Sequence, residues 1–293
     1  MEIDGVFSGG GMKAIAFVGA LEVMEQEGFI FKNVAGTSAG AIIATLITAG
    51  YKADEINQIL TEVDFKKFLD WPKRRMPFPY IKWLSFYWRM GLYKGDTLQK
   101  WMAKLLKAKG IETFGDIEEG TLKIIASDLT KGRIMILPED LTHYGINPNN
   151  FSIAKAVRMS AGIPYFFEPI KIYDGLGFKS VVVDGAVLSN FPIWLFKEKQ
   201  QRPVIGFKLS PRLEKIQPNI INNAFDMFPA LIETMINAHD ARYISQNFTD
   251  HIIFIPIESV KTTEFHLTEK MKKQLVEVGK QKAEEFVEKW TIK

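Results

Sequence analysis

The sequence predicts an α/β protein with a mainly parallel central sheet sandwiched by helices. Short apolar, strand-like runs alternate with helix-like runs up to about Lys208, and this alternation is typical of a parallel sheet covered by helices on both faces. The chain has 293 residues, 47% of them hydrophobic and 24% charged, enough for one large domain with a substantial core. No repeat, low-complexity linker or convincing boundary interrupts it, so we expect a single domain over residues 1–293.

The first expected strand, Ile3–Phe7, leads into the glycine loop Ser8-Gly9-Gly10-Gly11-Met12-Lys13. Three consecutive glycines expose backbone N–H groups beside the start of a helix, where they can bind a phosphate or the oxyanion of acyl transfer. Lys13 adds a positive charge. The loop does not match the nucleotide-binding pattern Gly-x-x-x-x-Gly-Lys-Ser/Thr. It does not complete Gly-x-Gly-x-x-Gly either, because Ala14 stands where the last glycine would be. A tight turn packed for steric reasons is the remaining alternative.

An amphipathic helix is expected after the glycine loop, with an apolar face formed by Phe17, Val18, Leu21 and Met24.

The second expected strand, Phe31–Ala35, leads into Gly36-Thr37-Ser38-Ala39-Gly40, and an uncharged helix-like run, Ala41–Ala49, follows. Strand, turn and helix are the setting in which Gly-x-Ser-x-Gly forms a nucleophile elbow. Gly36 and Gly40 permit a sharp turn and close contacts, and the helix start stabilises negative charge beside Ser38. With a serine elbow in the same chain, the oxyanion becomes the favoured ligand of the glycine loop.

The segment Trp71–Tyr93 differs from the rest of the chain because it holds eight aromatic and five basic residues but no acidic one. Aromatic rings settle at the level of lipid headgroups, and lysine and arginine attract anionic lipids. We therefore expect peripheral membrane contact here, by a lid or interfacial loop. The alternative is that the aromatic side chains pack on the core and leave the cations in solvent.

A candidate general base, Asp184, closes the apolar strand Ser180–Val183 and is followed by Gly185-Ala186. A carboxylate at the end of a buried strand is partly desolvated, which raises its pKa toward useful basicity. The alternative for an Asp-Gly step is a simple hairpin turn. The four histidines lie outside glycine-rich turns, and we expect ordinary surface or helix positions for His143, His239, His251 and His266.

The C-terminal part is expected to be helical, over about residues 218–246 and 268–290. We expect these helices to pack on the motif-bearing part of the chain, about residues 3–208. The last helix has an apolar stripe for this purpose, formed by Met271, Leu275, Val278, Phe286 and Trp290.

Taken in order, the motifs resemble those of the patatin-like phospholipases, over about residues 3–195. The resemblance is carried by Gly9–Lys13, Gly36–Gly40, the hairpin-like stretch Leu122–Leu137, Arg158–Pro164 with Phe166 and Pro169, Asp184–Ala186, and Asn190 with Pro192. It implies a patatin-like fold and a Ser-Asp dyad without histidine that acts on acyl esters of lipids.

Carried over residue by residue, the resemblance makes Ser38 the nucleophile and Asp184 the general base. It places the oxyanion hole at the backbone of Gly9, Gly10, Gly11 and Met12. Lys13, Gly36, Gly40 and Gly185 support the site. Ser8 and Ala14 depart from the family pattern, which often has an acidic residue and a glycine there, but neither departure removes a catalytic group.

Composition and the N-terminal sequence bear on the compartment, on metal sites and on nucleic-acid binding. The absence of cysteine excludes disulfides and thiolate metal sites and suits a reducing compartment. A net charge of +3 is too small to indicate nucleic-acid binding. The N-terminus enters a strand without a signal segment, and the uncharged span 33–51 contains the elbow and is not expected to cross a membrane. We expect a cytoplasmic protein, peripheral at the membrane, that needs no metal or organic cofactor.

The expected function is hydrolysis of fatty acyl esters of phospholipids or related lipids through an acyl-serine intermediate. A thioesterase or an acyltransferase would use the same residues. A lipid-binding or regulatory protein that has lost turnover is the non-enzymatic alternative, because fold and motif do not guarantee activity.

Overall fold

The computed structural model describes residues 1–70, 87–196, 202–210, 221–223, 249–257 and 262–291, together with residues 227, 230, 234, 240 and 260. Most of the helix expected over 218–246 and most of the aromatic segment Trp71–Tyr93 lie outside these residues. His239 lies outside them as well.

Ten strands are present in the described part of the chain. They are β1 (Glu2–Phe7), β2 (Ile30–Thr37), β3 (Gly91–Tyr93), β4 (Leu122–Asp128), β5 (Arg133–Leu137), β6 (Tyr165–Phe167), β7 (Ile170–Tyr173), β8 (Lys179–Asp184), β9 (Val204–Lys208) and β10 (Ile252–Phe254). The described α-helices are α1 (Ala16–Gln26), α2 (Ala39–Thr48), α3 (Ala53–Glu62), α5 (Asp96–Ala108), α6 (Ile153–Ser160) and α8 (Glu269–Thr291).

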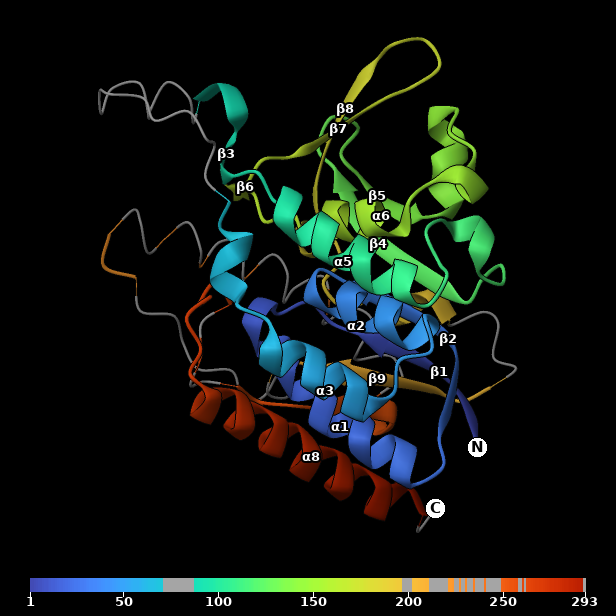
Figure 1. Ribbon diagram of the computed structural model, residues 1–293, viewed down its shortest axis with the longest axis vertical. Helices are drawn as coiled ribbons and strands as arrows, with labels where there is room; N and C mark the ends of the chain where they lie inside the picture. The colour runs from blue at the N-terminus through green and yellow to red at the C-terminus, as the bar shows by residue number, and fades with distance from the viewer. Residues whose placement is uncertain are drawn as a thin grey trace.

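The central sheet has eight described strands, seven of them in the order β10-β9-β1-β2-β4-β8-β7, with β5 paired to β4 beside this path. The five strands from β10 to β4 run parallel, whereas β5, β7 and β8 pair antiparallel. The prediction of a mainly parallel sheet with helices is therefore confirmed (Figure 1). A separate short parallel pair is formed by β3 and β6.

One edge of β4 is shared by two strands that approach each other end to end. On its first half β4 pairs with β2, with Thr37 opposite Ile125. On its second half β4 pairs with β8, with Asp184 opposite Ala126. Because β5 pairs with Ile124–Asp128, both β2 and β8 must lie along the other edge. Their carboxyl ends therefore meet at the middle of β4.

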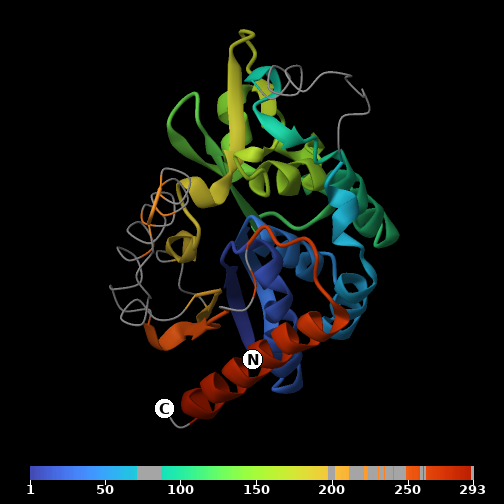
Figure 2. The ribbon, with the colours of Figure 1, turned by 90° about the vertical axis from the view of Figure 1, so that its left-hand side faces the viewer.

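Two buried apolar clusters lie on opposite faces of the sheet. Neighbouring residues of β1 divide between them, with Phe7 in the larger cluster and Val6 in the smaller, as alternation along a strand requires. The larger cluster lies under α1, α2, α3 and α8 (Figures 1 and 2). Described residues on the opposite face include the short 3-10 helix Ile193–Phe196.

Helix α1 is buried more completely than its amphipathic pattern predicts. All residues from Ala16 to Leu21 are buried because α8 lies across the outer side of α1 (Figure 2). Two glycines permit this close crossing. A Cβ on Gly19 would come within 1.9 Å of the Val276 carbonyl oxygen, and one on Gly279 within 1.7 Å of the Ala16 carbonyl oxygen.

The aromatic segment Trp71–Tyr93 is described only from Tyr87 onward, and its described aromatic side chains differ in their surroundings. Tyr87 and Trp88 are 72% and 70% exposed. Tyr93 instead packs on Phe166 with ring centroids 4.9 Å apart. The guanidinium of Arg89 lies 3.1 Å from a Glu168 carboxylate oxygen, so this cation is paired.

Candidate active site

The site is built around Ser38, at the junction of β2 and α2. Its backbone has φ 54° and ψ −121°, an unusual conformation for a residue with a side chain. Such strain is retained where the surroundings enforce it, and it is common at functional sites. Ser38 is only 5% exposed. The predicted strand–turn–helix setting of this serine is present in the structure.

The two glycines of the elbow are required by close backbone contacts. A Cβ on Gly36 would lie 2.3 Å from the Gly40 carbonyl oxygen, and one on Gly40 would lie 2.3 Å from the carbonyl oxygen of Phe7. Either side chain would force β1, β2 and α2 apart. The sharp turn therefore needs glycine at both positions.

The Ser38 hydroxyl donates a hydrogen bond to Asp184 Oδ2 at 2.7 Å. These residues are 146 positions apart in the sequence, and the shared edge of β4 brings them together. The other carboxylate oxygen, Oδ1, accepts a hydrogen bond from the backbone N–H of Ala186 at 2.9 Å. Gly185 lies against the Ile125 carbonyl. Asp184 is thus held in one orientation, and the Ser38 hydroxyl points at it.

Burial raises the pKa of Asp184 to about 7, from an ordinary value of 3.8. The Ser38 hydroxyl, the Ala186 N–H and the positive charge of Arg158 each lower this pKa, but they offset only part of the effect of burial. A carboxylate with a pKa near neutrality is a much stronger base than an exposed aspartate. It can accept a proton and return it near neutral pH.

Arg158 is a buried cation behind the site, on α6. Its Nη2 donates hydrogen bonds to the carbonyl oxygens of Lys94 at 2.6 Å and Glu168 at 2.7 Å. Its guanidinium lies over the ring of Phe167, 5.0 Å from the centroid. Burial lowers the pKa of Arg158 to about 10, so it remains charged at neutral pH and moderates the pKa of Asp184.

Ser160, at the end of α6, holds the backbone of the elbow. Its hydroxyl oxygen accepts a hydrogen bond from the Ser38 N–H at 2.8 Å and donates one to the Ile125 carbonyl. All three groups are buried. The sequence placed Ser160 in a motif but assigned it no role, because only the fold brings α6 next to β4 and the elbow.

The glycine loop lies beside the elbow. A Cβ on Gly9 would be 3.3 Å from Ser38 Cβ. The Gly9 N–H donates to the Asn190 carbonyl at 3.0 Å, and the Met12 N–H donates to the Thr262 carbonyl at 3.1 Å.

Two amides of the glycine loop thus already have acceptors. Within the described part of the chain, the amides of Gly10 and Gly11 have no backbone acceptor. The N–H groups of Gly9 and Met12, at the two ends of the predicted oxyanion hole, therefore donate to other acceptors in this structure. Gly10 and Gly11 are the candidates that remain. Lys13 follows them in the short 3-10 helix Gly11–Ile15.

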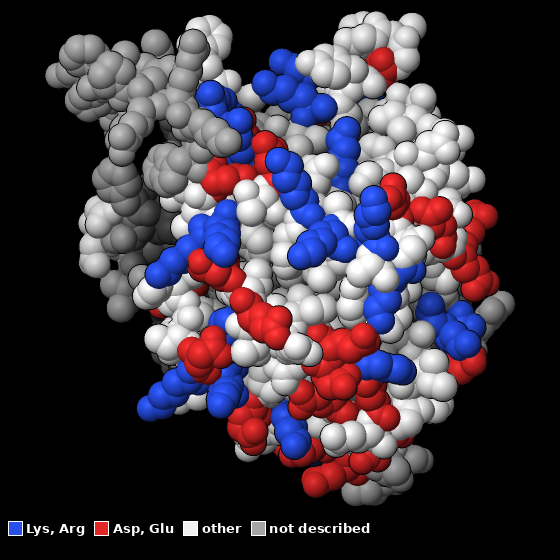
Figure 3. Space-filling model, in the orientation of Figure 1, with Lys and Arg blue, Asp and Glu red and all other residues white. Residues whose placement is uncertain are grey.

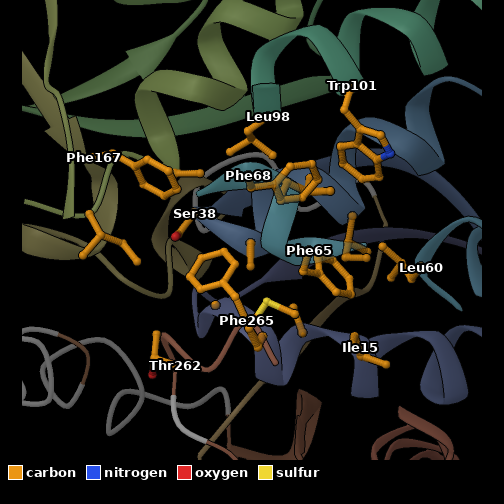
Figure 4. Close-up of a pocket in the computed structure, with 18 residues that line it drawn as sticks. Ile15, Ser38, Leu60, Phe65, Phe68, Leu98, Trp101, Phe167, Thr262 and Phe265 are labelled. Atoms are coloured by element: carbon orange, nitrogen blue, oxygen red, sulfur yellow. The ribbon is translucent and has the colours of Figure 1, made fainter. Parts of the chain in front are cut away.

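An apolar pocket opens at Ser38. Figure 4 shows Ser38 at one end and Leu60, Phe65 and Trp101 toward the other, with aromatic and aliphatic side chains between them. The lining comes from α2, α3, α5, β6, the connector before α8 and the short 3-10 helices Gly11–Ile15 and Phe65–Phe68. This almost wholly apolar lining suits a hydrocarbon chain.

Two lining residues, Thr262 and Phe265, come from the connector before α8, far from the motifs in sequence. The ring of Phe265 stacks on Phe166 with centroids 5.2 Å apart and planes at 10°. The Thr262 carbonyl accepts the Met12 N–H. Sequence reasoning missed both residues, because a polar connector shows no periodicity that could point to the pocket.

Three of the four histidines are described, and none of them hydrogen-bonds to Ser38 or Asp184. His143 Nδ1 lies 3.2 Å from an Asp140 carboxylate oxygen on an exposed turn. The His251 ring packs edge-on against Trp290, and His266 is exposed. Among the residues that the structure describes, no three His, Asp or Glu side chains are placed to hold a metal ion.

Comparison with known proteins points in one direction. A family model described as patatin-like phospholipase matches residues 5–197. The chain is 55% identical to the uncharacterized protein YqhO of Bacillus subtilis over 291 residues, which cover 99% of this chain and 100% of YqhO. It is 29% identical to a cUMP-AMP-activated phospholipase of Escherichia coli, over 63% of this chain and 54% of that protein.

Among solved structures, the fold is similar to that of VipD from Legionella pneumophila, with a TM-score of 0.60. The alignment covers 99% of this chain and 67% of VipD at 18% sequence identity, so the likeness concerns the fold.

Proposed function

Because this chain belongs to the patatin-like phospholipase family, a family of lipid hydrolases, we propose that it is a serine acyl hydrolase. Its proposed substrates are fatty acyl esters of phospholipids or related lipids. The observation that carries the proposal is the buried hydrogen bond of 2.7 Å from the Ser38 hydroxyl to Asp184, at the mouth of an apolar pocket.

In the proposed first step, Ser38 Oγ attacks the ester carbonyl carbon while Asp184 accepts the hydroxyl proton. The carbonyl oxygen becomes an oxyanion, which the amides of Gly10 and Gly11 stabilise. When the tetrahedral intermediate collapses, the bond to the alcohol oxygen breaks. Asp184 returns its proton to the leaving alcohol, and the acyl group stays on Ser38.

In the second step, water attacks the acyl-serine and Asp184 accepts a proton from it. The second oxyanion collapses, the fatty acid leaves, and the proton returns to Ser38 Oγ. A pKa near 7 suits both directions of this proton transfer.

The pocket supports a fatty acyl chain as the group bound beside Ser38. Its lining is almost wholly apolar, with Phe65, Phe68 and Trp101 along its length. A chain inserted among these side chains gains about 0.8 kcal/mol for each buried methylene group. A short polar acyl group would gain much less.

A panel of lipid classes tests this proposal. Purified protein is incubated with phospholipids, neutral glycerolipids and acyl thioesters, and the products are identified by mass spectrometry. We expect free fatty acid from phospholipid, and none from a folded Ser38→Ala variant, because loss of a nucleophile costs roughly 10⁴-fold or more in rate. Preference for thioesters, or transfer to an alcohol acceptor, would reassign the activity. No turnover of any class would support a binding or regulatory role.

For its location, we propose a cytoplasmic protein that contacts the membrane peripherally through the aromatic segment Trp71–Tyr93. The exposed rings of Tyr87 and Trp88 support this contact, because such rings settle at the headgroup level. No described helix combines the length and apolarity that a membrane crossing requires.

A further inference from the structure

The hairpin of β7 and β8 exposes large apolar side chains at its tip. Leu176 is 85% exposed, Phe178 68% and Tyr173 58%. The hairpin extends beyond the body of the molecule at the upper end of both ribbon views (Figures 1 and 2). Exposure of single apolar residues is ordinary, but three together on a protruding tip need an explanation.

Exposed apolar side chains gather at this end of the molecule. Of the twelve large apolar side chains exposed among the described residues, eight belong to β3, β6, the hairpin or adjoining residues: Tyr87, Trp88, Leu92, Leu129, Tyr165, Tyr173, Leu176 and Phe178. A large exposed apolar surface marks a protein or membrane contact.

Four backbone N–H groups of the tip donate to acceptors within the tip itself. The Asp174 N–H donates to the Phe178 carbonyl, and the Gly177 N–H donates to the Asp174 carbonyl. The Asp174 side chain accepts hydrogen bonds from the amides of Leu176 and Phe178 at 3.0 and 2.9 Å. Unpaired backbone groups are costly in lipid, so this arrangement favours contact with an apolar medium. It also turns the one acidic side chain of the tip toward its own backbone.

Cations flank the apolar tip. Lys171 and Lys179 are exposed, and neither forms an ion pair with a described residue. Lys179 lies opposite Tyr173 in the strand pairing. Lys131, on the neighbouring turn, is exposed, and its Nζ lies 4.0 Å from the centroid of the Tyr144 ring. In Figure 3 the upper end of this face shows white and blue side chains with little red, whereas acidic residues gather mainly in the lower half. Lysines beside apolar side chains are suited to an anionic lipid surface.

We propose that the tip of this hairpin, residues 173–179, is a membrane anchor that inserts Leu176 and Phe178 into the headgroup region of an anionic bilayer. The anchor rests on the proposed function in one respect, because it would hold the enzyme at the surface that carries its lipid substrate. The hairpin is separate in sequence from the active-site motifs and from the aromatic segment Trp71–Tyr93, three of whose residues, Tyr87, Trp88 and Leu92, are exposed at the same end of the molecule.

The absence of cysteine from the chain allows a direct test. Leu176→Cys in the full chain is labelled with an environment-sensitive nitrobenzoxadiazole dye. The matched control is Ile30→Cys, which labels another exposed apolar position, 55% exposed, at the start of β2 next to the N-terminus. The probe surfaces are vesicles of phosphatidylcholine, with and without phosphatidylglycerol.

With anionic vesicles, the dye at position 176 should shift its emission to the blue and brighten, and the dye at position 30 should not. The double variant Leu176→Asp with Phe178→Asp should sediment with these vesicles at least about tenfold more weakly than the unmodified protein. An unchanged dye spectrum at position 176, or equal sedimentation of the double variant, would overturn the anchor.

Activity on a water-soluble p-nitrophenyl ester separates this inference from the proposed function. The double variant should keep that activity, because Ser38 and Asp184 are untouched, and should lose about tenfold on phospholipid vesicles. Loss on both substrates in equal measure would show that the hairpin acts on the site itself, and the anchor would be rejected.

Discussion

The proposed reaction depends on one residue, Asp184, whose carboxylate is costly to ionise because the fold buries it. Burial of Asp184 raises its pKa to about 7, and the proposed base must be deprotonated to accept the serine proton. Activity measured as kcat/KM on a soluble ester should therefore fall about tenfold for each pH unit below that value and level off above it. A profile that stays flat between about pH 5 and 8 would contradict the assignment of the base.

Variants provide the control for this pH profile. Asp184→Asn keeps the shape of the side chain but cannot accept a proton, so it should be nearly as inactive as Ser38→Ala at every pH. Single replacement of His143, His251 or His266 by alanine should leave most activity, because none of these residues hydrogen-bonds to the dyad. A histidine variant as inactive as Ser38→Ala would favour a conventional catalytic triad.

Ser160 is expected to position the nucleophile through its hydrogen bond to the Ser38 N–H. Ser160→Ala leaves that buried N–H without its acceptor, which costs about 1–3 kcal/mol. We predict a decrease in kcat of roughly ten- to a hundredfold with little change in KM. The rate of fluorophosphonate labelling should decrease in parallel.

The matched control for Ser160 is Thr45→Val in α2, which removes a buried hydroxyl that has no hydrogen-bond partner among the described residues. Its labelling rate should be unchanged. If both variants slowed labelling equally, Ser160 would be a packing residue only.

At the scale of elements, the sequence predicted the strand, turn and helix around Ser38 and the strand that ends at Asp184. Each is a local pattern with a physical reason. The sequence could not predict that β2 and β8 meet on one edge of β4, because strand order depends on contacts between distant segments. The residues alone made Asp184 a candidate base, but its pairing with Ser38 in a dyad followed only from the family resemblance.

The pocket, too, was only partly predictable from the sequence. The apolar residues of α2 and α3 could be predicted to be buried, but not that they line a cavity. Thr262 and Phe265 reach Met12 and Phe166 from a connector without a pattern. Likewise, both sides of α1 are buried because α8 covers one of them. The apolar stripe of α8 predicted that this helix would be buried on one face, but not that it would pack on α1.

The crossing of α1 and α8 gives a prediction at this scale. Gly279→Val places a side chain where a Cβ already falls 1.7 Å from the Ala16 carbonyl oxygen. We expect a decrease of about 1–3 kcal/mol or more in the free energy of unfolding, measured with urea. The control is Gln281→Ala, at an exposed position of the same helix, which should change the free energy of unfolding by no more than about 0.5 kcal/mol. Equal stability of the two variants would show that the helices can separate at no cost.

For the whole molecule, the proposed reaction requires contact with a membrane, because the dyad is buried and its proposed lipid substrates lie in a bilayer. The aromatic segment Trp71–Tyr93 carries its cations mainly in residues outside the described part of the chain. Replacing Lys73, Arg74 and Arg75 together by glutamine should weaken binding to anionic vesicles, by about 1 kcal/mol for each cation near the surface.

The readouts are sedimentation with and without anionic lipid and hydrolysis of a soluble ester, which should change little. Undiminished vesicle binding in the triple variant would mean that these cations form only a solvated face.

Covalent trapping can show whether Ser38 is a nucleophile that Asp184 activates. The unmodified protein is treated with a fluorophosphonate, digested and analysed by mass spectrometry. We predict one phosphonylated residue, Ser38, with no adduct in Ser38→Ala and much slower labelling in Asp184→Asn. An adduct on another serine, or a folded protein that does not react at all, would contradict the account.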